Sequence, residues 1–326
     1  MLTPKFWRNT NPGILSFFLT PFSWVWKFFL KYRLSVNSYK VDVPVICVGN
    51  INMGGVGKTP TVIALIEKLK QKGLNPHVLS KGYGGKMSGP LLVSSGHNPG
   101  DVGDEPILIS AFAPTWISKD RVKGAKAAVE SGCDVIILDD GFQNQSIYKD
   151  FSIIVVDATI GFGNGKIFPA GPLRESIENA SKRGDIFLLV GGEKDILNFY
   201  RFYKLPNIPV CNAKIKIVET GIDWENTKVL AFAGIGYPEK FFRSLNEIGA
   251  KIIKEIALAD HANLSEKLLK RLKLEANMNG AILVTTEKDA IRLPANFKAE
   301  VITLPIKLHF NDWKTISCRL EKIIKY

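Results

Sequence analysis

The chain has 326 residues, of which 46% are hydrophobic and 23% charged, and its formal net charge is +12 at pH 7. This composition excludes an intrinsically disordered chain and is sufficient for two packed domains. The four cysteines lie far apart without a C-x-x-C pair, which excludes a disulfide framework and favours a reducing compartment. The positive charge favours an anionic partner such as nucleic acid, an acidic membrane or a phosphorylated substrate, although evenly spread lysines would give the same number.

Residues 14–32 form an apolar stretch in which polar residues recur every three or four positions. These polar residues are Ser16, Thr20, Ser23, Lys27 and Lys31. The spacing predicts a helix with one narrow polar stripe, and Trp24 and Trp26 suit a membrane interface. A signal peptide is not expected, because no small-residue cleavage site follows. We therefore expect residues 1–34 to form an amphipathic helix associated with a membrane surface; a helix of the soluble core is the alternative.

A glycine-rich segment lies between a predicted strand at 43–48 and a predicted helix at 61–71. It reads Asn52-Met53-Gly54-Gly55-Val56-Gly57-Lys58-Thr59. Strand, glycine-rich turn, Lys-Thr and helix is the order of a phosphate-binding P-loop, in which backbone N–H groups and the helix N-terminus surround the phosphates. Lys58 is predicted to reach the β- and γ-phosphates, and Thr59 to hold Mg²⁺. The usual first glycine is replaced by Asn52, which we interpret as a non-glycine residue that tolerates positive φ.

Alternating strands and helices predict an α/β fold with a mostly parallel sheet and helices on both faces, as in P-loop NTPases. Apolar runs at 76–80, 135–138, 151–156 and 186–190 are typical of buried parallel strands. We divide the chain into a P-loop core at 35–213, a ribbon or linker at 214–227, and a smaller α/β domain at 228–326 that ends in a helix at 313–325. Ligands of such open sheets bind beyond the carboxyl ends of the strands.

The predicted strand at 135–138 ends in Asp139 and Asp140. In P-loop proteins a strand of this kind lies beside the P-loop strand, and its terminal carboxylate holds Mg²⁺ directly or through water. Two adjacent carboxylates also need a cation or hydrogen bonds to offset their repulsion. A solvated pair at a strand end is the alternative. The sequence therefore predicts a nucleoside triphosphate and Mg²⁺ as ligands.

Several longer strings resemble the tetraacyldisaccharide 4′-kinase family, which acts in lipid A biosynthesis of Gram-negative bacteria. They occur in the family order over most of the chain: GNINMGGVGKTP, LSKGYGG, VGDEPILI, DRVKGAKAA, VIILDDGFQN, GKIFPAGPLRE, ADHA and LVTTEKDAIRL. The resemblance implies transfer of the ATP γ-phosphate to the 4′-hydroxyl of a tetraacylated glucosamine disaccharide 1-phosphate, forming lipid IVA. It also implies an enzyme at the cytoplasmic face of the bacterial inner membrane, peripheral or shallowly inserted.

The resemblance further implies roles for individual residues. Asp104 matches the general base, with His261 as its partner across an interdomain cleft, and Glu105 matches a further acidic residue near the metal. Lys81 and Arg121 match basic residues of the active site. The family commonly has Arg at the position of Lys81, and Lys lacks the planar fork for bidentate phosphate contact. Asn144 and Ala262 also stand where the family often has His.

Two other functions stay open at this point. One is a regulatory P-loop NTPase; the chain reads Glu287-Lys288-Asp289 where a GTPase would show N-K-x-D, and no RNA-binding module is apparent, so a nucleic-acid partner is not expected. The other is a P-loop kinase for a soluble sugar or nucleoside, against which the apolar N-terminal helix argues. The sequence predicts neither the oligomeric state nor the acyl-chain preference.

Overall fold

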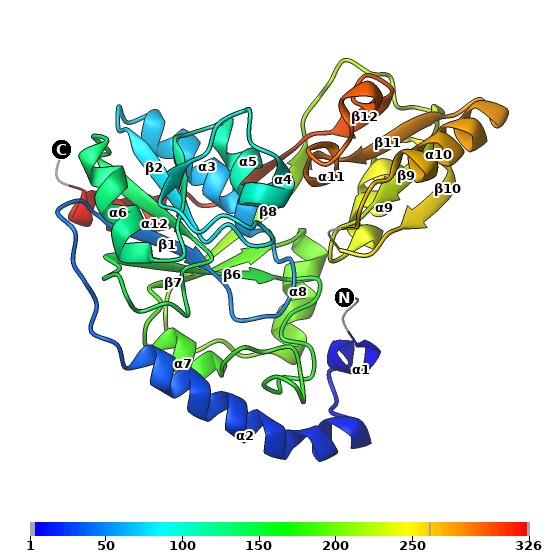
Figure 1. Ribbon diagram of the computed structural model, residues 1–326. Coiled ribbons are helices and arrows are strands. Elements are labelled where there is room, and N and C mark those ends of the chain that lie inside the picture. The colour runs from blue at the N-terminus through cyan, green and yellow to red at the C-terminus, as the bar shows by residue number, and fades with distance from the viewer. Residues whose placement is uncertain (1–3, 261, 325–326) are drawn as a thin grey trace. The chain divides into compact units, whose positions relative to one another are not determined.

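The structure is a computed structural model that describes residues 4–260 and 262–324 (Figure 1). The chain divides into two compact units. The larger unit contains the described residues of 4–215 and 308–324, and the smaller unit is Lys216–Lys307. Each unit has its own sheet, and the two are described separately below.

The larger unit is built on a nine-stranded sheet with the order β13-β8-β7-β6-β1-β5-β2-β4-β3. From β8 to β4 all neighbours in this order pair in parallel, whereas β3 is antiparallel to β4. The strands are β1 (Val45–Gly49), β2 (Pro76–Ser80), β3 (Leu91–Leu92), β4 (Thr115–Ile117), β5 (Val135–Asp139), β6 (Phe151–Asp157), β7 (Ile186–Val190), β8 (Val210–Ile217) and β13 (Ile306–Phe310). The central strands β1, β5, β6 and β7 are buried along their whole length, as their continuous apolar runs predict.

Helices cover both faces of this sheet. One core contains Leu65, Ile109 and Ile316, and the other contains Ala125 and Phe199, so that helices contribute to two separate hydrophobic clusters. The helices are α1 (Lys5–Arg8), α2 (Ile14–Leu34), α3 (Lys58–Lys70), α4 (Pro99–Val102), α5 (Asp104–Ser110), α6 (Arg121–Glu130), α7 (Ile177–Ser181), α8 (Glu193–Phe202) and α12 (Lys314–Ile323). The predicted α/β fold with helices on both faces is confirmed.

The smaller unit repeats the α/β pattern on a four-stranded parallel sheet with the order β10-β9-β11-β12. Its strands are β9 (Lys228–Ala233), β10 (Lys251–Ala257), β11 (Ile282–Thr286) and β12 (Val301–Leu304). Its helices are α9 (Pro238–Glu247), α10 (Glu266–Met278), α11 (Glu287–Ala290) and the short 3₁₀ helix η1 (Ala295–Phe297). Buried side chains form one cluster with Leu269 and another with Phe242.

The chain is divided differently from the expected domains in two places. The alternating segment around 214–218 is not a free ribbon, because residues 214–217 are the second half of β8, a strand of the nine-stranded sheet. The last strand and helix belong to the larger unit, not to the smaller domain expected at 228–326. Ile316, Leu320 and Ile324 are buried there in the same cluster as Val155, so apolar burial draws the C-terminal segment back to the larger sheet.

Helix α2 forms in the expected place but is unusual in which side it buries. Ser16 and Ser23 of the polar stripe are buried, whereas Phe17, Phe28 and Tyr32 are more than 70% exposed. Residues 4–260 and 262–324 contain no helix that is long and apolar enough to cross a membrane.

Candidate active site

The candidate site lies at the carboxyl ends of two neighbouring strands. β1 and β5 pair in parallel with Val48 opposite Asp139, so the P-loop and the two aspartates follow at the same edge of the sheet. The turn after β5 packs so tightly on the end of β1 that a Cβ on Gly49 would lie 2.4 Å from Cβ of Phe142. Glycine at this position lets the two loops approach each other.

The P-loop has the backbone that its sequence predicts. Gly54 and Gly57 have φ values of 106° and 92°, in the left-handed region that favours glycine. Gly57 is the N-cap of α3, so the helix begins at Lys58, three residues before the expected start. Thr59 is therefore the second residue of α3 and lies at its positive end, where an anion is stabilised.

The role of Asn52 in the P-loop differs from the one that we expected. Among the described non-glycine residues only Asp140 and Asn226 have positive φ, so tolerance of that conformation does not explain Asn52. Its buried side-chain amide instead donates a hydrogen bond of 2.8 Å to the carbonyl of Gly161. Asn50 donates to the carbonyl of Asn52 over 2.8 Å. The amides thus hold the first half of the loop, a contact that glycine could not make.

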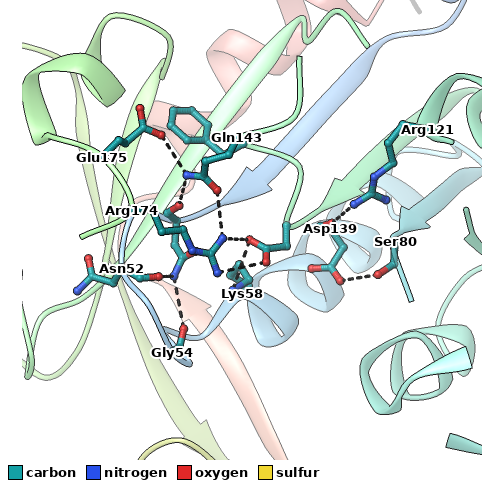
Figure 2. Close-up of polar contacts among 12 residues, drawn as sticks. Asn52, Gly54, Lys58, Ser80, Arg121, Asp139, Gln143, Arg174 and Glu175 are labelled. Carbon is teal, nitrogen blue, oxygen red and sulfur yellow. Dashed lines mark hydrogen bonds and ion pairs between the residues drawn. The ribbon is translucent and has the colours of Figure 1, made fainter. Parts of the chain in front are cut away.

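Asp140 pairs with two cations, Lys58 and Arg174, both of which are labelled in Figure 2. Arg174 donates to its two carboxylate oxygens over 3.0 and 3.4 Å, and Nζ of Lys58 lies 3.6 Å from Oδ1. Burial alone would raise the pKa of Asp140, but Lys58 and Arg174 lower it to about 2. Asp140 therefore stays ionised and holds two cations at the P-loop.

Asp139 has the opposite environment. Its side chain is buried, its Oδ2 accepts a hydrogen bond of 3.2 Å from Ser80, and its Oδ1 has no hydrogen-bond partner among the described residues. Burial, followed by the charges of Glu105 and Asp140, raises the pKa of Asp139. A cation would stabilise a buried carboxylate of which one oxygen accepts no hydrogen bond.

The two predicted basic residues differ in their surroundings. Arg121 is buried and donates to the carbonyls of Leu79 (3.0 Å) and Asp139 (3.2 Å), so it joins the ends of β2 and β5 behind the aspartates. Lys81 is exposed directly after β2. A contact of either side chain with nucleotide stays a prediction.

Asp104 and Glu105 open α5, with Gly103 as the N-cap, so Asp104 is the first helical residue. The loop before it packs on the Gly82–Gly85 loop: a Cβ on Gly103, whose φ is 93°, would lie 2.6 Å from the carbonyl oxygen of Tyr83. Asp104 is buried, and the charge of Glu105 acts on Asp139. Two strings that are about 20 residues apart in the sequence are thereby brought together.

His261 lies outside the described residues, and Asp260 belongs to the smaller unit, where Lys288 lies 3.8 Å from it. The pairing of Asp104 with His261 stays a prediction.

Three side chains that are not among the predicted site residues complete the cluster. Gln143 accepts a hydrogen bond from Arg174 (3.1 Å) and donates to Glu175 (3.1 Å) and to the carbonyl of Asn50 (2.8 Å), as Figure 2 shows. Glu175 is also paired with Arg183. The DDGFQ and PAGPLRE strings contain Gln143, Arg174 and Glu175, and their combination of charged and amide side chains on Gly/Pro-shaped loops was the available signal.

The residues present fit a magnesium ion bound together with phosphate. In the described ranges no group of three or more His, Cys, Asp or Glu side chains could hold a metal ion. Mg²⁺ usually takes only one or two carboxylates and completes its shell with phosphates and water. The buried Oδ1 of Asp139 without a hydrogen-bond partner suits this hard cation. Asp139, Thr59, Asp140 and Glu105 stay the predicted metal set, although Asp140 already pairs with Lys58 and Arg174.

Comparison with known proteins identifies the family. The family model of tetraacyldisaccharide-1-P 4′-kinase matches residues 15–325. This chain belongs to that family. The tetraacyldisaccharide 4′-kinase of Jannaschia sp. (strain CCS1) is 46% identical over 99% of this chain and 99% of its own length. That of Dinoroseobacter shibae is 44% identical over 88% of this chain and 86% of its own length.

A solved structure agrees with this assignment. The crystal structure of LpxK from Aquifex aeolicus in complex with ATP has a TM-score of 0.78 to this chain, with 27% sequence identity, and covers 95% of this chain and 100% of its own. The family resemblance and the predicted class of enzyme, a tetraacyldisaccharide 4′-kinase, are confirmed.

Proposed function

We propose that this chain transfers the γ-phosphate of ATP to the 4′-hydroxyl of a tetraacylated glucosamine disaccharide 1-phosphate, forming lipid IVA in lipid A biosynthesis. The observation that carries the proposal is the meeting of a P-loop lysine and two aspartates at adjacent strand ends, in a chain that matches the 4′-kinase family over residues 15–325. A kinase needs positive charge at the phosphates and an acceptor for the proton of the attacking hydroxyl.

Lys58 and Arg174 supply the positive charge. Asp140 fixes both cations by ion pairs, so that little reorganisation is needed when charge develops on the transferred phosphoryl group. Thr59 and Asp139 would hold Mg²⁺, which when bound neutralises charge on the phosphate oxygens. Gln143 and Glu175 fix the guanidinium of Arg174 from the other side.

Asp104 is the proposed base for the sugar hydroxyl. It is buried in the same unit as the P-loop and opens α5 next to Glu105, whose charge acts on Asp139. A carboxylate that accepts the proton late in the transfer is sufficient for a reaction that depends mainly on positioning and charge neutralisation. His261 is proposed as its partner on the strength of the family resemblance.

The membrane surface is the proposed location of the substrate. Ten large apolar side chains of α2, among them Phe17, Phe28 and Trp24, are more than half exposed, which is more than singly scattered surface residues. Lys27 and Lys31 on the same helix are also exposed and could meet anionic headgroups. An exposed aromatic face with flanking lysines suits a helix that lies in the bilayer interface, on the cytoplasmic side where ATP is present.

The deciding experiment is radiolabelled ATP transfer to tetraacyl disaccharide 1-phosphate in mixed micelles with Mg²⁺. Wild-type protein should label the lipid, and Lys58→Ala should not. Asp104→Ala should lower kcat by at least about 100-fold while ATP binding persists, because it acts on the acceptor side. Asp101→Ala, three residues earlier in α4, is the matched control and should keep its activity. Phosphate release without lipid labelling would instead favour an NTPase switch, and labelling of a soluble sugar another acceptor.

Vesicle flotation tests the membrane part separately. Replacing Phe17 and Phe28 by Ser should weaken binding to anionic vesicles at least about tenfold, because each buried aromatic ring contributes about 1.5–3 kcal/mol. Phe202→Ser is the control, since Phe202 is also exposed but lies on α8. Equal binding by all variants would refute α2 as the membrane contact.

A further inference from the structure

Two serines of the polar stripe of α2 face the protein rather than water. Ser16 is fully buried and Ser23 is 4% exposed, Trp26 on the same side packs against the core, and the other aromatic residues of the helix and Lys27 and Lys31 are exposed. Water-facing helices of globular proteins bury the apolar face and expose the polar one. The reversed arrangement means that the polar residues have partners inside the larger unit.

Those partners are backbone carbonyls of one segment, residues 167–174. Ser16 donates a hydrogen bond of 2.8 Å to Ala170, and Ser23 donates one of 2.7 Å to Ile167. The indole Nε1 of Trp26 donates to the carbonyl of Arg174 over 2.8 Å. Trp7, which precedes α2, donates in the same way to Pro169 over 3.1 Å.

The segment needs such external contacts because it has almost no secondary structure of its own. Its described pairing consists of isolated bridges from Leu173 to Asn52 and to Ile167. The position of a loop of this kind depends on the side chains that bind its backbone. Helix α2 therefore holds one side of the segment by hydrogen bonds, and the first residues of the P-loop hold the other side.

Arg174 contacts both α2 and the P-loop cluster. Its carbonyl accepts from Trp26 of α2, and its guanidinium donates to Asp140, which lies 3.6 Å from the Lys58 ammonium. Arg174 thus connects helix α2 to the carboxylate that pairs with Lys58. The N–H of Arg174 also donates to the carbonyl of Ile51 over 2.6 Å, so its backbone is held between α2 and the loop after β1.

We infer that Trp26, supported by Ser23 and Ser16, is a positioning residue for the phosphoryl transfer: it sets Arg174 beside Asp140 and Lys58. Helix α2 then has two roles, contact with the lipid surface through its exposed rings and support of the active site through Trp26 and its buried serines. The inference rests on the proposed function, because it assigns a task in that reaction. It also means that a lipid surface which orders α2 also orders Arg174.

The test is Trp26→Phe in the full chain, which removes the indole donor and keeps a ring next to Phe168, whose ring centroid lies 4.9 Å from that of Trp26. We expect kcat for lipid phosphorylation to fall about tenfold, with KM for ATP and vesicle binding nearly unchanged, because the loss acts on the placement of a transition-state contact. Trp116→Phe is the matched control: it also loses one indole hydrogen bond, the 3.2 Å bond to His77 of β2, and should keep wild-type kcat.

A double-variant comparison separates positioning from general damage. In the Arg174→Ala background, Trp26→Phe should cause no further loss of kcat, because its effect passes through Arg174. An equal tenfold loss in both backgrounds would overturn the inference. Where Trp26→Phe lowers the melting temperature, Ser23→Ala replaces it, with an expected loss of about threefold that also disappears without Arg174.

The outcomes distinguish the inference from the proposed function on which it rests. Absence of lipid labelling by the wild-type protein would refute the function itself. Labelling by the wild type, together with identical kcat for Trp26→Phe and Trp116→Phe, would refute only the positioning role.

Discussion

Two buried aspartates, one in each unit, lie at the carboxyl edge of a parallel sheet. Asp139 is the last residue of β5 in the larger unit and is 1% exposed; Asp289 lies in α11, directly after β11 of the smaller unit, and is fully buried. Burial raises the pKa of both carboxyl groups. The difference lies in the partners of their oxygens.

Asp289 is fully hydrogen-bonded. The backbone N–H of Gly234 donates to its two oxygens over 3.1 and 3.0 Å, and Thr286 donates over 2.6 Å. Arg292 pairs with it and also donates to the carbonyls of Gly234 and Ala262. This network joins the loop after β9 to the carbonyl of Ala262, which is a structural task.

The carboxylate of Asp139 is only partly hydrogen-bonded. Ser80 donates to its Oδ2, and Oδ1 has no hydrogen-bond partner in the described part of the chain. An unsatisfied buried carboxylate costs stability, and proteins retain this cost mainly at functional sites. The two aspartates therefore differ in the hydrogen bonding of their oxygens rather than in burial or position in the fold, and this difference supports the proposed functional role of Asp139.

The largest effect on folding should follow removal of Asp289. Asp289→Ala leaves the buried guanidinium of Arg292 without its carboxylate and should lower the free energy of unfolding of the smaller unit by about 3–5 kcal/mol. Hydrogen exchange of the β9 and β11 peptides in the full chain measures the loss. The double variant with Arg292→Met should recover part of it; no recovery would show that the pair is not the source.

Asp139→Asn should give the reverse result. We expect the rate of lipid phosphorylation to fall about 10²–10³-fold, equivalent to about 3–4 kcal/mol of transition-state stabilisation. The free energy of unfolding of the larger unit should stay the same or rise, because a buried charge is removed. Parallel activity and urea-unfolding measurements check both halves. A loss of stability as large as that of Asp289→Ala would remove the contrast between the two residues.

A smaller effect is expected for Ser80→Ala. Ser80 is the described hydrogen-bond donor to the Asp139 side chain, over 3.2 Å. Its loss should cost about 1 kcal/mol, or about fivefold in kcat, by loosening the carboxylate. Ser94→Ala, on an exposed loop of the same unit, is the control in the same kinetic assay. Unchanged kcat in Ser80→Ala would show that other groups hold Asp139.

The smallest effect is expected for His77, a buried titratable residue of β2 with which the two aspartates can be compared. Burial lowers its pKa, although the charge of Asp134 opposes the shift. Below the ordinary pKa of about 6.5 the unfolded chain binds a proton that the folded chain binds less well, so stability should fall as the pH drops from about 7 to about 5. His77→Phe should remove this pH dependence, which we expect to change the free energy of unfolding by less than about 1 kcal/mol between the two pH values. Urea midpoints at both pH values measure it, and an unchanged slope would assign it to other groups.

The sequence predicted what depends on contiguous residues. The strand, glycine turn and Lys58 follow one another, and Asp139 and Asp140 end a continuous apolar run, so local pattern was sufficient. The pairing of Asp140 with Arg174 was not predictable, because 34 residues and the course of β6 separate them. Nor could periodicity say which side of α2 faces the protein, since the acceptors of Ser16 and Ser23 lie 154 and 144 residues away.

The return of β13 and α12 to the larger sheet has a consequence for biosynthesis. Residues of the smaller unit are contiguous in the chain, whereas the core of the larger unit includes Ile316 and Leu320 from α12. During translation the smaller unit can fold as soon as it leaves the ribosome, but the catalytic core stays open until α12 has emerged. The hydrophobic core of the larger unit is therefore completed only after the whole of the smaller unit has been translated.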